Sequence, residues 1–255
     1  MDFPFQTEAW DFGPWLVGAT ADYYLLADAH LAAVDAGQDN AEALEAEWRS
    51  HAGEMAREIA RYLVLACGGE LRHNAKARHD AGWSKAATIP RDLSWERVKV
   101  ALEGADDAWV SQVMTGWAER FAAPGEYHGS LGGKPWAQAC SLTAQYLSGE
   151  INCVLFIEYT LNLHHNCAII FNKRPLPSQY VQILAAGAAN LDEPGRWSLI
   201  CQHGSPERMK LWLTARGLQQ SDVKAVAPRS PKLSVSSPKT PKVPQAGVPV
   251  GNQLW

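Results

Sequence analysis

The stretch AEALEAEWRSHAGEMAREIARYLVLACGG, residues 41–69, decides the fold. Its apolar side chains recur every three or four residues, as on one face of a helix, and its charged side chains fall on the other face. Asp39 with Glu42 forms a capping pattern before the stretch, and Gly68-Gly69 after it is typical of a helix stop. The sequence therefore predicts a long helix over 41–66, with an apolar stripe of Leu44, Trp48, Met55, Ile59, Tyr62 or Leu63, and Ala66.

The flanking sequence indicates more helices. Patterns and capping residues (Ser94, Asp106 or Asp107, and Pro135 at a first helical position) predict helices over 14–34, 95–103, 107–122, 135–147, 178–190 and 206–216. Residues 151–163 alternate as a strand would and also suit a helix, which we favour because the neighbours are helical. A short strand is predicted over 196–201. The predicted fold class is mainly α with a minor strand component, as a single compact helical domain over 1–220.

The last part of the chain differs sharply in charge. Residues 1–222 hold all 27 acidic side chains and 18 of the 23 Lys and Arg, which gives −9, whereas 223–255 are purely basic at +5. Six prolines and few large apolar residues predict that the tail, residues 221–255, is disordered. It repeats Ser230-Pro231-Lys232, Ser237-Pro238-Lys239 and Thr240-Pro241-Lys242.

Two roles suit this tail: a solubilising linker, or a tether to nucleic acid or to an acidic protein partner. The cations for the second role are Lys224, Arg229, Lys232, Lys239 and Lys242. The acidic body is itself one acidic surface, so the tail could dock within the chain. The terminal Leu254-Trp255 could serve as a docking peptide for a protein partner, because Trp supplies much apolar area at little ordering cost.

Composition points to a cytoplasmic protein. The sequence has no run of 18 apolar residues and no signal-peptide pattern, so no membrane association is predicted. Five widely spaced cysteines predict free thiols rather than disulfides. The sequence has no Cys-x-x-Cys pair, and neither a metal site nor a cofactor is predicted.

Two polar segments could carry chemistry. Glu70, Arg72 and His73 follow the expected glycine stop, and His165 and Asn166 lie between two apolar segments, with Lys173 shortly after. If the two segments converge, a carboxylate could orient an imidazole while Arg72 or Lys173 holds an anionic group. The alternative is a solvated loop after a helix and a pair of hydrogen-bonded core histidines.

Two further patterns are weaker. His79-Asp80, with His51 upstream and Asp107 downstream, resembles the ligand order of HD-type metal phosphohydrolases, although the dyad here has basic and weakly apolar neighbours. The glycine-rich segment 127–135 lacks the Walker spacing. It could hold an anion through backbone amides, or it could simply connect two elements.

Three short motifs carry a resemblance to a known group of proteins. Gly-Gly-Glu-x-Arg-His at 68–73, Gly-Gly-Lys-x-Trp-Ala at 132–137 and His-Asn-x-x-x-x-Phe-Asn-Lys at 165–173 resemble an uncharacterised family from tailed phages and mobile elements. The resemblance covers about residues 60–175, and Ala168 stands where the family carries glycine. It implies a genomic setting and no mechanism. If the gene belongs to a phage, the expected compartment is the host cytoplasm.

Two functions therefore stay open. The first is a phage or mobile-element type binding protein, whose body contacts protein and whose tail contacts nucleic acid or an acidic partner. The second is an enzyme with a Glu, Arg, His and Asn site that acts on an anionic substrate. The enzyme requires the two polar segments to converge over a concave pocket, whereas the binding protein does not.

Overall fold

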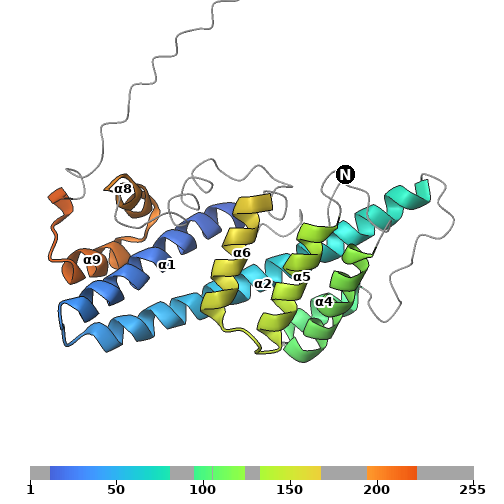
Figure 1. Cartoon of the computed structure of the whole chain (residues 1–255), viewed down its shortest axis with the longest axis horizontal. Coiled ribbons are helices and arrows are strands. Elements are labelled where there is room, and N and C mark those ends of the chain that lie inside the picture. The colour runs from blue at the N-terminus through green and yellow to red at the C-terminus, as the bar shows by residue number, and fades with distance from the viewer. Residues whose placement is uncertain (1–11, 81–94, 105, 124–132, 168–193, 223–255) are drawn as a thin grey trace, which may run out of the picture.

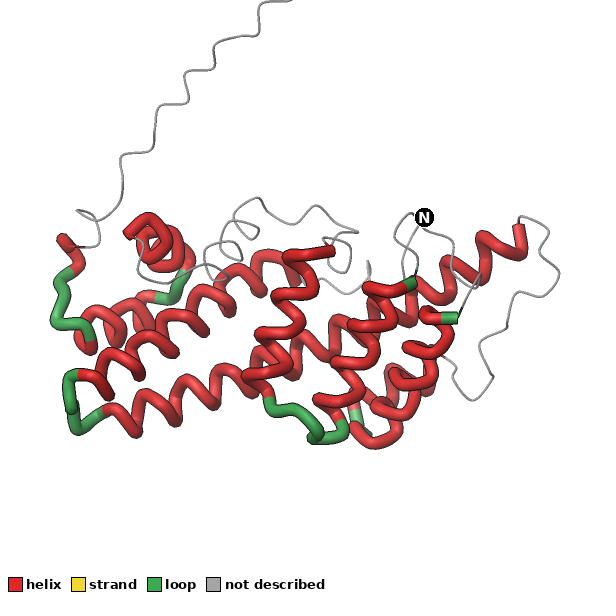
Figure 2. Tube along the Cα trace, viewed as in Figure 1, coloured by secondary structure: helices red, strands yellow, loops and turns green. Residues whose placement is uncertain are grey.

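A computed structural model describes residues 12–80, 95–104, 106–123, 133–167 and 194–222. These residues form helices joined by turns, without a strand among them, so the mainly helical fold class is confirmed (Figure 2). The helices are α1 (Phe12–Asp35), α2 (Ala41–Asp80), α3 (Trp95–Glu103), α4 (Asp107–Ala122), α5 (Lys134–Leu147), α6 (Cys153–Cys167), α8 (Pro194–His203) and α9 (Pro206–Ala215).

Helix α2 is the longest helix described, and it contacts α1, α4, α5 and α6. Helices α1 and α2 run side by side as an antiparallel pair, while α4, α5 and α6 contact α2 farther along (Figure 1). The predicted apolar stripe is the buried face, since Leu44, Met55, Ile59 and Leu63 are each 3% exposed or less. This burial of large apolar side chains supplies the main favourable term for folding.

Helices α8 and α9 pack against the opposite flank of α1. The carboxylate of Asp28 on α1 is buried there and receives three hydrogen bonds. Trp212 Nε1 and Arg216 Nε donate to its Oδ2 at 2.7 Å each, and Arg216 Nη2 donates to Oδ1 at 2.5 Å. The Trp197 ring stacks on Trp212 and also contacts the Arg216 guanidinium. A charge buried with this many donors is satisfied, so Asp28 fixes α9 to α1.

The close approach of α8 to α1 depends on a glycine. A Cβ atom at Gly204 would overlap Leu25 Cδ1 and lie 3.3 Å from Asp22 Oδ1. Just beyond it, the backbone amide of Ser205 donates to the Asp22 carboxylate at 2.7 Å. Gly204 therefore lets the α8–α9 turn lie directly against α1.

Helix α1 also contacts α6 through a buried phenol. Tyr23 on α1 is 2% exposed, and its hydroxyl donates a hydrogen bond of 2.9 Å to Glu158 Oε1 on α6. Burial and the neighbouring Glu158 carboxylate raise the pKa of Tyr23 well above its ordinary value.

Three helices end at a glycine in the left-handed region. Gly37, Gly149 and Gly217 have φ of 62°, 80° and 63°, and the amide after each glycine donates to the carbonyl five residues earlier, at 2.9 Å in each case. This is the Schellman ending, which requires a residue that tolerates positive φ.

The helix stop predicted at Gly68-Gly69 is wrong, because α2 continues without interruption to Asp80. Neither residue is among the glycines with positive φ, and both are buried, between Cys67 and Leu71, which are buried as well. Glycine in a helix interior costs about 1 kcal/mol relative to alanine, and packing of the surrounding turns against the core outweighs that cost.

Among the other predicted local structures, a strand is wrong, while a helix and a helix cap are confirmed. The strand predicted over 196–201 is wrong, since α8 spans it and its apolar residues Trp197, Ile200 and Cys201 bury one helical face. The helix favoured over 151–163 is confirmed by α6. Asp106 caps α4 as expected, accepting a bond of 3.2 Å from the Trp109 amide. The predicted helix over 178–190, Ser94 and the tail lie outside the described residues.

The cysteines whose side chains are described, Cys67, Cys140, Cys153 and Cys201, are free thiols, as predicted. Within the described part of the chain, every helix is too short or too polar to cross a membrane.

Candidate functional site: a groove between α1 and α2

The predicted Glu70, Arg72 and His73 cluster is not a loop but part of α2. Successive residues of a helix are turned by about 100°, so Glu70 and His73 share a face while Arg72 lies opposite Glu70. Their burial agrees: Glu70 is buried, His73 is half-buried and Arg72 is exposed. The loop in which this cluster was predicted is therefore absent, and Arg72 lies on a different face of α2 from Glu70 and His73.

The second predicted segment is described only in part. His165 and Asn166 fall within the last turn of α6, but their side chains, and the whole of Lys173, lie outside the described residues. Their convergence with Glu70 and His73 stays a prediction. The same holds for the predicted binding residues of the tail, Lys224, Arg229, Lys232, Lys239, Lys242 and Trp255.

Two of the residues that suggested a metal phosphohydrolase, His51 and Asp107, have other partners, whereas the side chains of His79 and Asp80 lie outside the described residues. His51 Nε2 donates to the carbonyl oxygen of Ala19 at 2.8 Å, and Asp107 forms an ion pair of 2.7 Å with Arg57. Among the described residues, no group of three or more His, Cys, Asp or Glu side chains is placed to hold a metal ion.

The Gly-Gly-Lys motif before α5 has a packing role at its second glycine. Gly133 is buried, and a Cβ atom there would overlap the carbonyl of Phe121 at the end of α4. A glycine at this position lets the start of α5 lie against the end of α4. The rest of the predicted loop, residues 127–132, lies outside the described residues.

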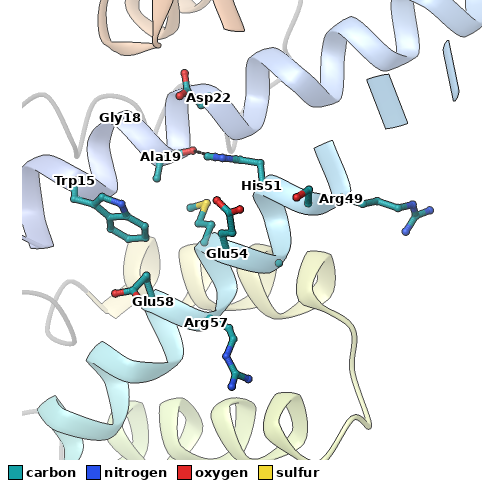
Figure 3. A pocket seen from close by; sticks show the side chains of 12 residues that line it. Trp15, Gly18, Ala19, Asp22, Arg49, His51, Glu54, Arg57 and Glu58 are labelled. Carbon is teal, nitrogen blue, oxygen red and sulfur yellow. Dashed lines mark hydrogen bonds between the residues drawn. The ribbon is translucent and has the colours of Figure 1, made fainter. Parts of the chain in front are cut away.

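A groove of about 980 Å³ runs between α1 and α2, and the sequence did not indicate it (Figure 3). Its sides come from residues of α1 between Trp15 and Asp22 and of α2 between Arg49 and Glu58. Small residues widen it: a Cβ atom at Gly53 would meet no heavy atom within 4 Å. The groove is thus open to a side chain or a peptide from outside.

The two arginines of the groove are directed away from it (Figure 3). Arg49 pairs with Glu45 on its own helix at 2.7 Å. Arg57 reaches across to Asp107 on α4, also at 2.7 Å, and hydrogen bonding to that carboxylate raises the pKa of the Arg57 guanidinium. The positive charge that α2 contributes here is therefore already neutralised.

Glu54 and Glu58 are one helical turn apart on α2, on the side of the groove. Among the described residues neither has an ion-pair or hydrogen-bond partner. Glu54 is exposed and Glu58 is half-buried. Carboxylates at this spacing repel each other slightly, because their Cβ atoms are only about 5–6 Å apart. The groove therefore presents unneutralised negative charge.

An aromatic ring faces the same space. Trp15 of α1 is half-buried and extends between the two helices toward Glu58 (Figure 3). The ring of Phe12 lies 5.5 Å from it, centroid to centroid, and stacks on Tyr62 of α2. Trp15 thus packs against Phe12, and part of its indole remains exposed to a ligand.

This arrangement suits recognition of a cation. Carboxylates attract an ammonium or guanidinium group, and the face of an indole binds the same groups through the cation–π interaction. His51 is committed to the Ala19 carbonyl and links the two helices across the groove.

The sequence pattern had assigned Glu58 to a solvated face of the helix. The spacing of Glu54 and Glu58, two like charges at i and i+4, was the one available signal.

Comparison of the chain with protein-family models, with curated proteins and with solved structures finds no match. The resemblance to a phage family stays a prediction.

Proposed function

We propose that this chain is an interaction protein, and that its α1–α2 groove binds a lysine- or arginine-bearing segment of polypeptide. The single observation that carries the proposal is the pair of unpartnered carboxylates, Glu54 and Glu58, beside Trp15, in a groove whose own arginines are held in ion pairs elsewhere. A cationic side chain in this groove gains two carboxylate partners and an aromatic face without displacing an existing ion pair.

The energies of the expected ion pairs and of the cation–π contact indicate a modest and salt-sensitive affinity for a cationic peptide. Exposed ion pairs contribute about 0.2–1 kcal/mol each, and a cation–π contact contributes about 0.5–1 kcal/mol at an exposed site. Together these terms orient and select a cation, while most of the affinity must come from backbone and apolar contacts along the groove. Salt weakens the charged terms because they are open to solvent.

The experiment uses the full chain and a fluorescent synthetic peptide of alternating lysine and glycine. We expect the Glu54→Gln/Glu58→Gln variant to bind the peptide about tenfold more weakly than the wild type, because a tenfold loss corresponds to about 1.4 kcal/mol, or two such ion pairs. The control is Glu103→Gln/Glu119→Gln, which removes the same charge from exposed positions on α3 and α4. Equal binding by the two double variants would overturn the proposal.

The enzyme alternative and the tail's contact with nucleic acid have no comparable support. Arg72 is separated from Glu70 by the geometry of α2, and the remaining members of the predicted polar site lie outside the described residues. Both hypotheses stay predictions from the sequence.

A further inference from the structure

We propose that the chain's own basic segment, residues 237–243, occupies the α1–α2 groove, so that an external cationic ligand must compete with it. This inference rests on the proposed function of the groove. It goes further in naming the occupant and in making the groove self-regulated.

Charge complementarity is the first argument. Residues 223–255 carry five Lys and Arg and no acidic residue, whereas the preceding part of the chain sums to −9. Within the groove, Glu54 and Glu58 have no ion-pair partner among the described residues. The sequence of the tail and the groove thus carry opposite charges.

The composition of the segment also fits the groove. It reads Ser-Pro-Lys-Thr-Pro-Lys-Val, with Pro238 and Pro241 each preceding a lysine. Proline-rich peptides bind aromatic-lined grooves, where an indole packs on a proline ring. With three residues per polyproline turn and a rise of about 3.1 Å, Lys239 and Lys242 would lie on one side, about 9 Å apart. Trp15 offers the aromatic surface, and two glutamates one turn apart offer the carboxylates.

The path of the chain brings the tail within reach. The end of α9 lies at the α1–α2 turn, where Gln38 Nε2 donates to the Ala215 carbonyl at 2.9 Å. Glu54 lies 13 positions after Ala41, the first residue of α2, which is about 20 Å along the helix. The 17 residues from Val223 to Lys239 can extend about 50 Å, so the segment can reach the groove. A tether of this length gives a high effective concentration.

Peptide competition gives the first test. The probe is a labelled peptide with the sequence of residues 236–243, added to the full chain. We expect Lys239→Gln/Lys242→Gln to bind the probe about tenfold more tightly than the wild type, because its own segment no longer competes. The matched control, Lys224→Gln/Arg229→Gln, removes the same tail charge outside the segment, and we expect it to bind like the wild type.

Carbodiimide cross-linking of the monomeric full chain gives the second test. We expect mass spectrometry to find Lys239 or Lys242 joined to Glu54 or Glu58, and these products to vanish in Glu54→Gln/Glu58→Gln but to persist in Glu103→Gln/Glu119→Gln. Probe binding that is equal in the wild type and in Lys239→Gln/Lys242→Gln, without such cross-links, would overturn this inference and leave the groove's proposed function standing. Absence of probe binding in every variant would overturn both.

Discussion

Acidic residues have different roles on the two sides of α1. On the flank that meets α8 and α9, Asp28 is 5% exposed and accepts three hydrogen bonds from Trp212 and Arg216. On the flank that meets α2, Glu54 and Glu58 border an open groove and have no ion-pair or hydrogen-bond partner among the described residues. A buried charge must be satisfied within the fold, whereas an exposed one remains available to a ligand. We therefore assign the first flank to stability and the second to binding.

The largest expected effect is on the satisfied flank. Asp28→Ala leaves the guanidinium of Arg216 and the indole N–H of Trp212 without their acceptor. We expect it to lower the free energy of unfolding by about 3 kcal/mol, as for a broken buried ion pair. Urea denaturation of the full chain measures this loss. Asp35→Ala, at an exposed position of α1, is the control and should change stability by less than about 0.5 kcal/mol. A loss below about 1 kcal/mol for Asp28→Ala would show that the network does not fix α9.

The next effect tests the close contact on the same flank. Gly204→Ala places a methyl group against Leu25, which is fully buried. Overpacking of this kind costs about 1–3 kcal/mol. We expect a fall in thermal midpoint, together with faster proteolysis between α8 and α9. An unchanged midpoint would mean that α8 moves away from α1 at little cost.

Alkaline pH should also act on this flank. Burial raises the pKa of the Cys201 thiol to about 11, from an ordinary value near 9. Between these values the unfolded chain loses the proton while the folded chain keeps it, so stability falls as pH rises from 9 to 11, by about 1 kcal/mol per pH unit. Cys201→Ala should reduce this slope, and the part that remains should come from the other buried groups whose pKa is raised, Cys140 first. If the unfolding free energies of wild type and variant run parallel from pH 8 to 11, Cys201 is not the group responsible.

A smaller effect of opposite sign is expected in the groove. A methyl group at Gly53 meets no atom within 4 Å, and alanine is the better helix former. We expect Gly53→Ala to raise the free energy of unfolding by about 0.5–1 kcal/mol. The same substitution at Gly116 of α4, which also has open space around it, is the matched control for the helical gain. Destabilisation by Gly53→Ala alone would indicate that the groove is closed.

The sequence was a good guide where one helical face carries the pattern. Leu44, Met55 and Ile59 identify the buried face of α2 because their spacing follows the helical period directly. Gly68-Gly69 misled because the same dipeptide can end a helix or lie in its packed interior, and only tertiary contacts decide between them. The loop predicted after that stop, which would place Arg72 beside Glu70, was wrong for the same reason, because these residues continue α2.

The groove could not be read from the sequence. Glu54 and Glu58 look like an ordinary solvated face of α2, and the ion pair that removes Arg57 from the groove joins residues 50 positions apart. Trp15 lines the same groove as these glutamates only because α1 folds back on α2. A site assembled by long-range pairing leaves no local motif.

The contrast between the two flanks is tested most directly by measuring stability and ligand affinity on the same variant. For Glu54→Gln/Glu58→Gln we predict a free energy of unfolding within about 0.5 kcal/mol of the wild type, since only an i, i+4 repulsion is removed. Its affinity for the lysine peptide should fall about tenfold. A variant destabilised by about 2 kcal/mol or more, with unchanged peptide affinity, would contradict the account, because the two glutamates would then serve the fold and not a ligand.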